Sequence, residues 1–196
     1  LLPVVMMVMV SLMPPDVRAP AFGGLLMTKF SFYNYNLVVE DVPIVRHFLN
    51  SFIITIPSVA MVAIFGSMAG FAFSRLRFKG NRVLFSLLLT TLMLPIATLI
   101  IPLFQINNGL GLYNTYPALI LPYAAIGIPF ALVIFRGFFD GFPRSLEDAA
   151  RIDGCGAGRI YWQIIMPMSG PVVSVVIIWQ TMKSWNAKTR TSQRSR

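Results

Sequence analysis

The chain has 196 residues, of which 56% are hydrophobic and 12% charged, whereas an ordinary soluble domain carries about 25% charged residues. Its formal net charge is +9, but the basic residues fall in short blocks between long uncharged runs, which is typical of membrane-flanking loops and not of a nucleic-acid-binding face. We therefore predict a membrane protein that does not bind nucleic acid. The single cysteine, Cys155, excludes an internal disulfide and zinc sites built from several cysteines.

The N-terminal part is apolar only over its first residues. Residues 1–12 begin with neither an initiator methionine nor the basic residues of a signal peptide. We predict that they form the end of a transmembrane helix whose start is missing from the sequence. Residues 13–51 are predicted to be an external segment.

Three uncharged runs follow, over residues 52–74, 83–106 and 115–135. As a helix, the first would reach about 35 Å, more than the roughly 30 Å hydrocarbon core of a bilayer. Prolines recur in or beside these runs, and membrane helices tolerate them because neighbouring helices and waters satisfy the freed carbonyls. We predict an all-α, polytopic bundle of kinked membrane helices. The prolines are Pro57, Pro95, Pro102, Pro117, Pro122 and Pro129.

The loops predict the orientation. The loop between the first two runs, "RLRFKGNR", carries four basic residues, whereas the loop "NNGLGLYNT" at residues 107–115 carries no charge. The positive-inside rule therefore places the former in the cytoplasm and the latter outside. By alternation, residues 136–171 are predicted to be cytoplasmic.

This cytoplasmic stretch, "SLEDAARIDGCGAGRIYWQIIMPMSGP", is unusually polar for the chain. Ser145 and Asp148 fit a capping box, which predicts that a short helix starts at Ser145. Gly154 is expected to end that helix in a turn. A second, apolar-faced helix should then reach Pro167, with Ile160, Trp162, Ile164 and Ile165 against the membrane helices. We call residues 143–167 the elbow.

The spacing within the elbow resembles a known motif. The elbow aligns without gaps with the EAA loop of the membrane-spanning subunits of bacterial ABC importers, through Asp148-Ala149-Ala150, Gly154, Ile164 and Met166-Pro167. It departs from the motif at two positions: Asp148 stands where the motif has Glu, and Met166 stands where it has Leu. The phrases "AGFAFSRLRFKG", "IPLFQINNGLGLYNTYPALILPY" and "SWN" are similar to the sugar-importing, maltose-type branch.

The resemblance implies a type I ABC importer transmembrane domain over residues 52–182, in the bacterial inner membrane among its lipids. It implies as partners cytoplasmic ATPase subunits, a second permease subunit and an external solute-binding protein, with a sugar as the solute. The chain lacks a GxxxxGK[ST] phosphate loop, so ATP is expected in the ATPase and this chain is expected to be neither an enzyme nor a cofactor carrier. The residues expected to couple to the ATPase are Glu147, Asp148, Ala149, Ala150, Asp153, Gly154, Ile164 and Pro167.

Several polar or aromatic residues near the spans are candidates for lining a sugar pathway, although packing by interhelical hydrogen bonds is the competing role for each. They are Asn50, Gln105, Trp179, Gln180 and Asn186. The elbow could also be an ordinary interfacial helix. The whole chain could belong to a polyamine, phosphate or amino-acid importer, to a secondary carrier, or to an inactive membrane remnant. The absence of charge from the three long runs argues against an ion-coupled carrier.

The C-terminal part does not fit the resemblance. Residues 168–182 are uncharged over only about 22 Å of helix, which is short for a span. Residues 183–196 form an atypical basic tail, and we expect the last helix to insert poorly. A single span over residues 160–182 is the competing interpretation, which Pro167 disfavours.

Overall fold

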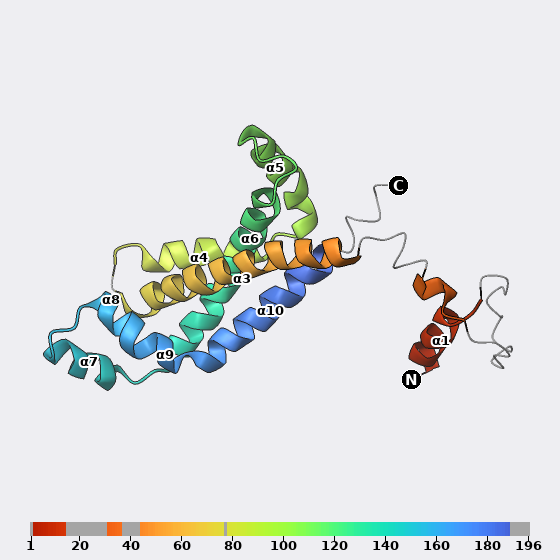
Figure 1. Cartoon of the computed structure of the whole chain (residues 1–196). Coiled ribbons are helices and arrows are strands. Elements are labelled where there is room, and N and C mark those ends of the chain that lie inside the picture. Colours follow the sequence, from red (N-terminus) through yellow and green to blue (C-terminus); the bar gives the residue numbers. More distant parts are fainter. Residues whose placement is uncertain (1, 15–30, 37–43, 77, 189–196) are drawn as a thin grey trace. The chain divides into compact units, whose positions relative to one another are not determined.

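A computed structural model describes residues 2–14, 31–36, 44–76 and 78–188 (Figure 1). These residues form helices and turns, without a β-strand among them. The all-α prediction is therefore confirmed. The chain divides into two units, Leu1–Asn50 and Ser51–Arg196.

The first unit contains α1 (Leu2–Ser11) and a helical turn over residues 33–36. The two are joined by polar contacts, because the Asn34 amide donates to the carbonyl of Met13 at 2.8 Å and the hydroxyls of Ser11 and Tyr35 lie 2.8 Å apart. Much of the predicted external segment 13–51, namely residues 15–30 and 37–43, lies outside the described residues.

The remaining helices carry the rest of the described chain. Two of them are long and apolar enough to cross a membrane: α3 (Ile44–Arg75) and α6 (Pro117–Asp140). The others are α4 (Asn81–Leu92), α5 (Ile96–Gly109), α7 (Arg144–Ile152), α8 (Ala157–Ile160), the π-helix η1 (Tyr161–Ile165), α9 (Met166–Met168) and α10 (Gly170–Lys188).

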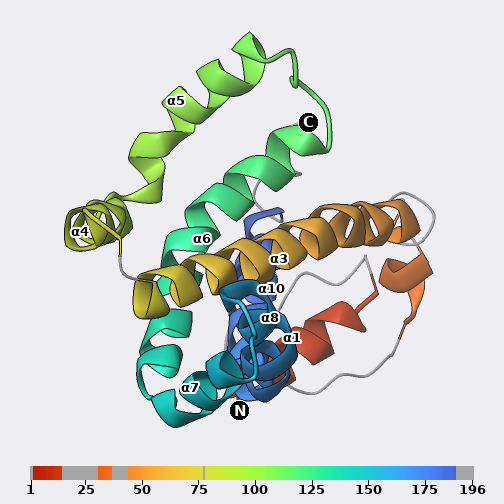
Figure 2. The same cartoon turned by 90° about the vertical axis from the view of Figure 1, so that its left-hand side faces the viewer.

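The uncharged run 83–106, expected to be one span, is two helices. The axes of α4 and α5 differ by 103° across the break. Pro95 caps α5 with φ −65° and ψ 132°, and a proline disfavours helical geometry in the residue before it, here Leu94. Neither α4 nor α5 buries a residue. Figure 2 shows α5 set apart from the packed helices α3, α6 and α10, whereas α4 contacts α6 through Phe85 and Arg136.

Close packing of α3 on α6 forms the centre of the second unit. A Cβ added at Gly66 would lie 2.6 Å from the Cβ of Ala131, and one at Gly70 would lie 2.6 Å from the Cβ of Phe135. Small residues four apart allow helix backbones to approach closely in a membrane, where van der Waals packing replaces the hydrophobic effect between helices. This spacing therefore sets how α3 crosses α6.

Helix α10 starts at a sharp bend. The pair of segments Ala157–Met168 and Gly170–Trp185 is bent by 78°, and buried Ser169 at the break donates its hydroxyl to the carbonyl of Ile165 at 2.6 Å. A single straight span over residues 160–182 is thus excluded. Residues 189–196 of the predicted tail lie outside the described residues, and residues 183–188 continue α10.

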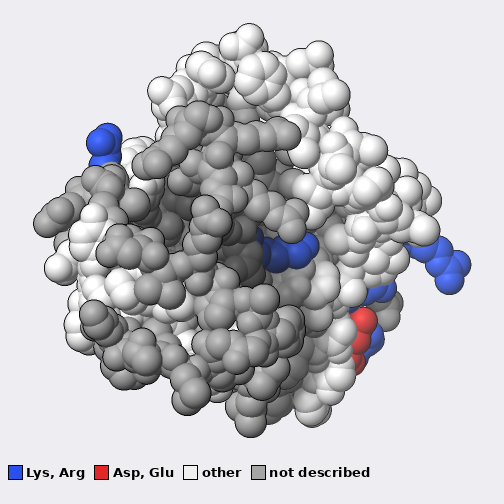
Figure 3. Space-filling view, turned by 90° about the vertical axis from the view of Figure 1, so that its right-hand side faces the viewer, with Lys and Arg blue, Asp and Glu red and all other residues white. Residues whose placement is uncertain are grey.

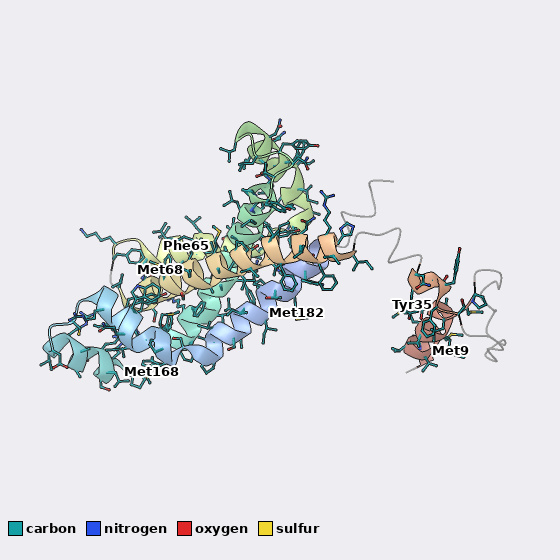
Figure 4. All side chains as sticks on the ribbon, in the orientation of Figure 1. Met9, Tyr35, Phe65, Met68, Met168 and Met182 are labelled. Atoms are coloured by element: carbon teal, nitrogen blue, oxygen red, sulfur yellow. The ribbon has the colours of Figure 1, made fainter. Side chains whose placement is uncertain are left out.

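The outward surface of the second unit is apolar. Figure 4 labels Phe65, Met68, Met168 and Met182 among its side chains, and each is about half exposed or more. On the face drawn in Figure 3, charged side chains are few among the described atoms. Such a surface suits lipid tails or other membrane helices.

Candidate functional site

The elbow lies at one end of the second unit, beside the C-terminal end of α3 and the start of α10 (Figure 1). It consists of α7, a turn, and the nearly continuous segment of α8, η1 and α9. In Figure 2, α6 leads directly into α7. The end of a membrane-length helix thus continues into the elbow within a few residues.

The start of α7 differs from the prediction. The capping box is wrong, because α7 begins at Arg144 with Pro143 as its N-cap, and no side chain caps it. Ser145 therefore lies inside the first turn. Pro143, at φ −60° and ψ 122°, enters the helix with the fixed φ that proline imposes, and this replaces a hydroxyl cap as the start signal.

The end of α7 is the glycine turn that the sequence predicts. Gly154 has φ +80°, a left-handed conformation that side chains with a Cβ rarely adopt. The amide of Cys155 donates to the carbonyl of Ala150 at 2.9 Å, and that of Gly154 to Arg151 at 3.0 Å. This pair of bonds is the Schellman motif, which satisfies the last carbonyls of the helix.

Arg75, the last residue of α3, holds the elbow to the bundle. Its Nε lies 2.8 Å from Oε1 of Glu147, and the two side chains are only 3% and 7% exposed. Neither of these two atoms has another hydrogen-bond partner among the described residues. The guanidinium also donates from Nη2 to the carbonyls of Phe139 and Phe142. One buried cation thus joins α3, the end of α6 and α7.

A second contact joins α3 to the other half of the elbow. The hydroxyls of Ser67 and Tyr161 lie 2.7 Å apart and are buried. The Tyr161 ring packs against Phe71 with centroids 5.3 Å apart. Since Ser67 and Arg75 are both on α3, one helix contacts the elbow on both sides of its glycine turn.

A neighbouring network ties the same ends together. The Ser74 hydroxyl donates to Oδ1 of Asp140 at 2.6 Å, and Nε of Arg136 lies 3.6 Å from Oδ2 of that carboxylate. The Arg136 guanidinium also sits 3.8 Å from the centroid of the Phe85 ring on α4. These contacts therefore join the ends of α3, α4 and α6 that lie beside the elbow.

The predicted coupling residues divide by exposure. Asp148, Ala149, Asp153, Gly154 and Pro167 are exposed, Ile164 is half-buried, and Glu147 and Ala150 are 5% and 6% exposed. Adjacent helix positions point about 100° apart, so Glu147 and Asp148 face different environments.

The apolar side of the elbow is only partly as predicted. Ile160 and Ile165 are almost fully buried, and Ile164 packs against the core. Trp162 was expected to do the same and is instead 55% exposed. The π-helical turn at η1 shifts the register of the helical face, because a π turn inserts one residue into the α-helical repeat.

The candidate pathway residues differ in burial. Gln180 is 2% exposed and donates its amide to the Tyr123 carbonyl at 3.2 Å, against the face of Gly127. Gln105 is exposed on α5 and Asn50 is half-buried. The side chain of Asn186 lies outside the described residues. Interhelical packing is therefore the geometry observed for Gln180.

Trp179 stands in a different arrangement. Its ring stacks on Phe130 of α6 with centroids 3.8 Å apart and planes 19° apart. Nζ of Lys183 lies 4.3 Å from the Trp179 ring centroid. A cation over an aromatic ring contributes about 0.5–2 kcal/mol.

Comparison with known proteins identifies the chain. The family described as "Binding-protein-dependent transport system inner membrane component" matches residues 62–189. The chain belongs to this family. As a member, with its membrane-length apolar helices, it is a multi-pass protein of the bacterial inner membrane.

Individual relatives of this inner membrane component are permeases named for sugars. It is 34% identical over 170 residues to the diacetylchitobiose uptake permease NgcG of Streptomyces coelicolor, covering 84% of this chain and 56% of the relative. It is 44% identical over 139 residues to the arabinooligosaccharide permease AraQ of Halalkalibacterium halodurans, covering 71% and 49%. The trehalose permease SugB of Mycobacterium tuberculosis is 32% identical over 186 residues, covering 95% and 67%. The chain thus spans about half to two thirds of these relatives.

The fold of the component matches a solved transporter. A chain from the crystal structure of a bacterial ABC transporter involved in importing the acidic polysaccharide alginate aligns with a TM-score of 0.81 at 23% identity. The alignment covers 94% of this chain and 64% of that one. The membrane helix bundle expected from the sequence is therefore the fold of an ABC importer subunit.

The contacts of Arg75 and Lys183 were not predicted from the sequence. Arg75 was interpreted only as a cytoplasmic loop charge, yet it is the buried partner of Glu147. Arg75 directly follows an uncharged run of membrane length, whereas Lys79 and Arg82 lie further into the loop. This difference in position is the sequence signal that could have distinguished Arg75 from the other loop charges. Lys183 was assigned to the tail, although it follows an uncharged run without a break in helical spacing.

Proposed function

We propose that the chain is a membrane-spanning permease subunit of an ATP-driven ABC importer for a sugar or oligosaccharide. The relatives named for diacetylchitobiose, arabinooligosaccharides and trehalose support the solute class. The partners are cytoplasmic ATPase subunits, a second permease subunit and an external solute-binding protein. ATP is bound and hydrolysed by the ATPase, and this chain catalyses no reaction.

The observation that carries the proposal is the double attachment of the elbow to α3, through Arg75–Glu147 and Ser67–Tyr161. Coupling between two sites requires an element whose position differs between global states. An elbow fixed to a membrane-length helix transfers its displacement to that helix. An interfacial helix without these buried contacts would not.

In this mechanism the exposed side of the elbow meets the ATPase and the buried side meets the bundle. Asp148, Ala149, Asp153 and Gly154 form the outward contact. Glu147, Ala150 and Ile164 hold the elbow to the bundle, and exposed Pro167 precedes the bend at Ser169. Trp179, Gln105, Asn50 and Asn186 remain proposed pathway residues, whereas Gln180 serves helix packing.

The test is ATP-dependent uptake by proteoliposomes that contain this subunit with its partner permease, ATPase and binding protein. We expect uptake of a labelled oligosaccharide and an ATPase activity stimulated by the loaded binding protein. Asp148→Lys, which reverses an exposed elbow charge, should lower the stimulated activity at least about tenfold, a change of roughly 1.4 kcal/mol. Lys79→Glu, which reverses a charge in the other cytoplasmic loop, is the matched control. Uptake without ATP, or of a polyamine in place of sugars, would contradict the proposal.

A further inference from the structure

A hollow of about 470 Å³ lies where α3 ends and the chain turns into α4 (Figure 1). Its volume falls within the range of about 300–1,000 Å³ that small-molecule sites occupy. Because α3 is a helix of membrane length, a hollow at its end lies where the hydrocarbon core gives way to the lipid headgroups. The lining residues are Phe73, Ser74, Leu76, Phe78, Lys79 and Asn81.

Side-chain contacts give the hollow a fixed shape. The Asn81 amide donates to the carbonyls of Phe73 and Leu76 at 3.2 and 3.4 Å, which ties the start of α4 to the end of α3. The Phe73 ring packs against those of Phe78 and Phe85, with centroids 5.5 and 5.9 Å apart. These contacts hold the two ends of the turn together and form an aromatic wall.

The charge beside this wall is positive, and no carboxylate of the neighbouring chain balances it. Lys79 lines the hollow and Arg82 follows in the first turn of α4, and both are exposed. The ion pairs among the described residues use Arg75 and Arg136 and not these two. Residues 42–139 contain no Asp or Glu. The two cations therefore favour an anion that the chain itself does not supply.

The start of α4 continues this surface with an apolar face. Val83, Leu84 and Leu87 are 64%, 48% and 59% exposed, and exposed aliphatic side chains next to a membrane-length helix suit lipid tails. A ligand that brings an anion to the hollow and hydrocarbon to α4 is an anionic phospholipid. A zwitterionic headgroup fits less well, because Lys79 and Arg82 repel the cation that it carries.

We propose that the hollow between α3 and α4 binds the phosphate of an anionic phospholipid, with Lys79 and Arg82 as its cations and the acyl chains along α4. A phosphate accepts charge-assisted hydrogen bonds from ammonium and guanidinium groups. Phe73 and Phe78 offer apolar contact to the glycerol carbons beside it. By the positive-inside rule the lipid belongs to the cytoplasmic leaflet. This inference goes beyond the proposed function and does not depend on it, since it requires only a membrane location.

The test measures lipid contact at the hollow. Phe78→Trp in the importer complex places a fluorophore in the aromatic wall, and the complex without this substitution gives the background to subtract. Nanodiscs of phosphatidylcholine receive increasing fractions of phosphatidylglycerol with brominated acyl chains, which quench tryptophan on contact. We expect phosphatidylglycerol to be preferred over brominated phosphatidylcholine at least about tenfold, because each basic residue adds about fivefold. Ile56→Trp, a reporter on an exposed position in the opposite half of α3, should show a preference below about twofold.

Charge variants assign the preference to particular side chains. Lys79→Met in the Phe78→Trp background should lower it about fivefold, and adding Arg82→Met should abolish it. Lys79→Arg keeps the cation and should retain the preference. Arg151→Met removes an exposed arginine from α7, which makes it the matched control, and it should leave the preference unchanged.

Three results would overturn the lipid site: no preference at Phe78→Trp, an equal preference at Ile56→Trp, or an undiminished preference in Lys79→Met. Relief of the quenching by inorganic phosphate would assign the hollow to a free anion and would also overturn it. ATP-driven uptake is measured separately, so the importer assignment stands or falls without these results. In vesicles of neutral lipid the hollow has no anionic lipid to bind in any variant, and Lys79→Glu remains a charge control for the elbow there.

Discussion

Replacing Arg75 by methionine should release the elbow from α3. Methionine fills part of the same volume but leaves the Glu147 carboxylate buried without its cation. It also removes the donor to the carbonyls of Phe139 and Phe142 at the end of α6. The bundle itself should persist, because the close contacts of α3 with α6 at Gly66 and Gly70 do not involve Arg75.

The size of the effect follows from burial. Removing one partner of a buried ion pair costs about 3–5 kcal/mol, since the remaining charge is left without compensation. Each lost hydrogen bond from a charged donor adds about 1.5–3 kcal/mol. A residue exposed by only 3% has no solvent to replace these contacts. The elbow escapes the penalty by moving Glu147 into water, and this displaces α7.

Cys155 reports that displacement. Its thiol is half-buried and packs against the core beside the glycine turn, so release of α7 should raise its rate of maleimide labelling at least about tenfold, equivalent to 1.4 kcal/mol. Arg151→Met, which removes an exposed arginine from the same helix, is the control and should leave the rate unchanged. Glu147→Leu in the Arg75→Met background should restore slow labelling. A rate in Arg75→Met within about twofold of wild type would refute the clamp, because it would correspond to less than about 0.5 kcal/mol.

Two further predictions concern glycines with different roles. Gly66→Val should lower the free energy of unfolding of the detergent-solubilised protein by about 1–3 kcal/mol, measured by thermal unfolding, because the new Cβ would overlap that of Ala131. Gly137→Val is the control and should be tolerated, because Gly137 has open space around it. Gly154→Val should reduce solute-stimulated ATP hydrolysis while membrane insertion stays intact, since valine adopts φ +80° only with strain. Normal stimulation in this variant would contradict the role of the turn, and Gly156→Val, at φ −74°, is the comparison.

The sequence predicts features that depend on local chemistry. Long uncharged runs locate α3 and α6 because a bilayer selects by length and polarity over contiguous residues. Gly154 ends α7 because the left-handed turn requires a residue without a Cβ. The start of α7 was misplaced for a related reason. A serine followed by a carboxylate is a common helix start, but Pro143, two residues earlier, already fixes the backbone.

Features that depend on contacts between distant segments were not predictable in the same way. In the sequence, Arg75 is equally consistent with a basic loop residue of the positive-inside rule and with a member of a buried ion pair. Only the folded structure brings Glu147 next to it. The turn from α4 to α5 was expected to be a kink within a span, because membrane helices tolerate proline. Leu94 and Pro95 together redirect the chain by 103°. No residue of either helix is buried to hold them in line.

The two adjacent carboxylates of the elbow serve different contacts, one with the membrane helices and one with the proposed ATPase. Glu147 is committed to Arg75 and is buried, whereas Asp148 is exposed one helix position later. The elbow can pass a movement of the ATPase to α3 only if its contacts with α3 are stronger than its contacts with the ATPase. The buried Arg75–Glu147 pair meets this condition. Breaking it costs more than the roughly 0–1 kcal/mol that a typical exposed ion pair contributes. An ATPase that pulls on the Asp148 side should therefore detach from the elbow before the elbow detaches from α3, and its movement up to that point should be carried into the membrane.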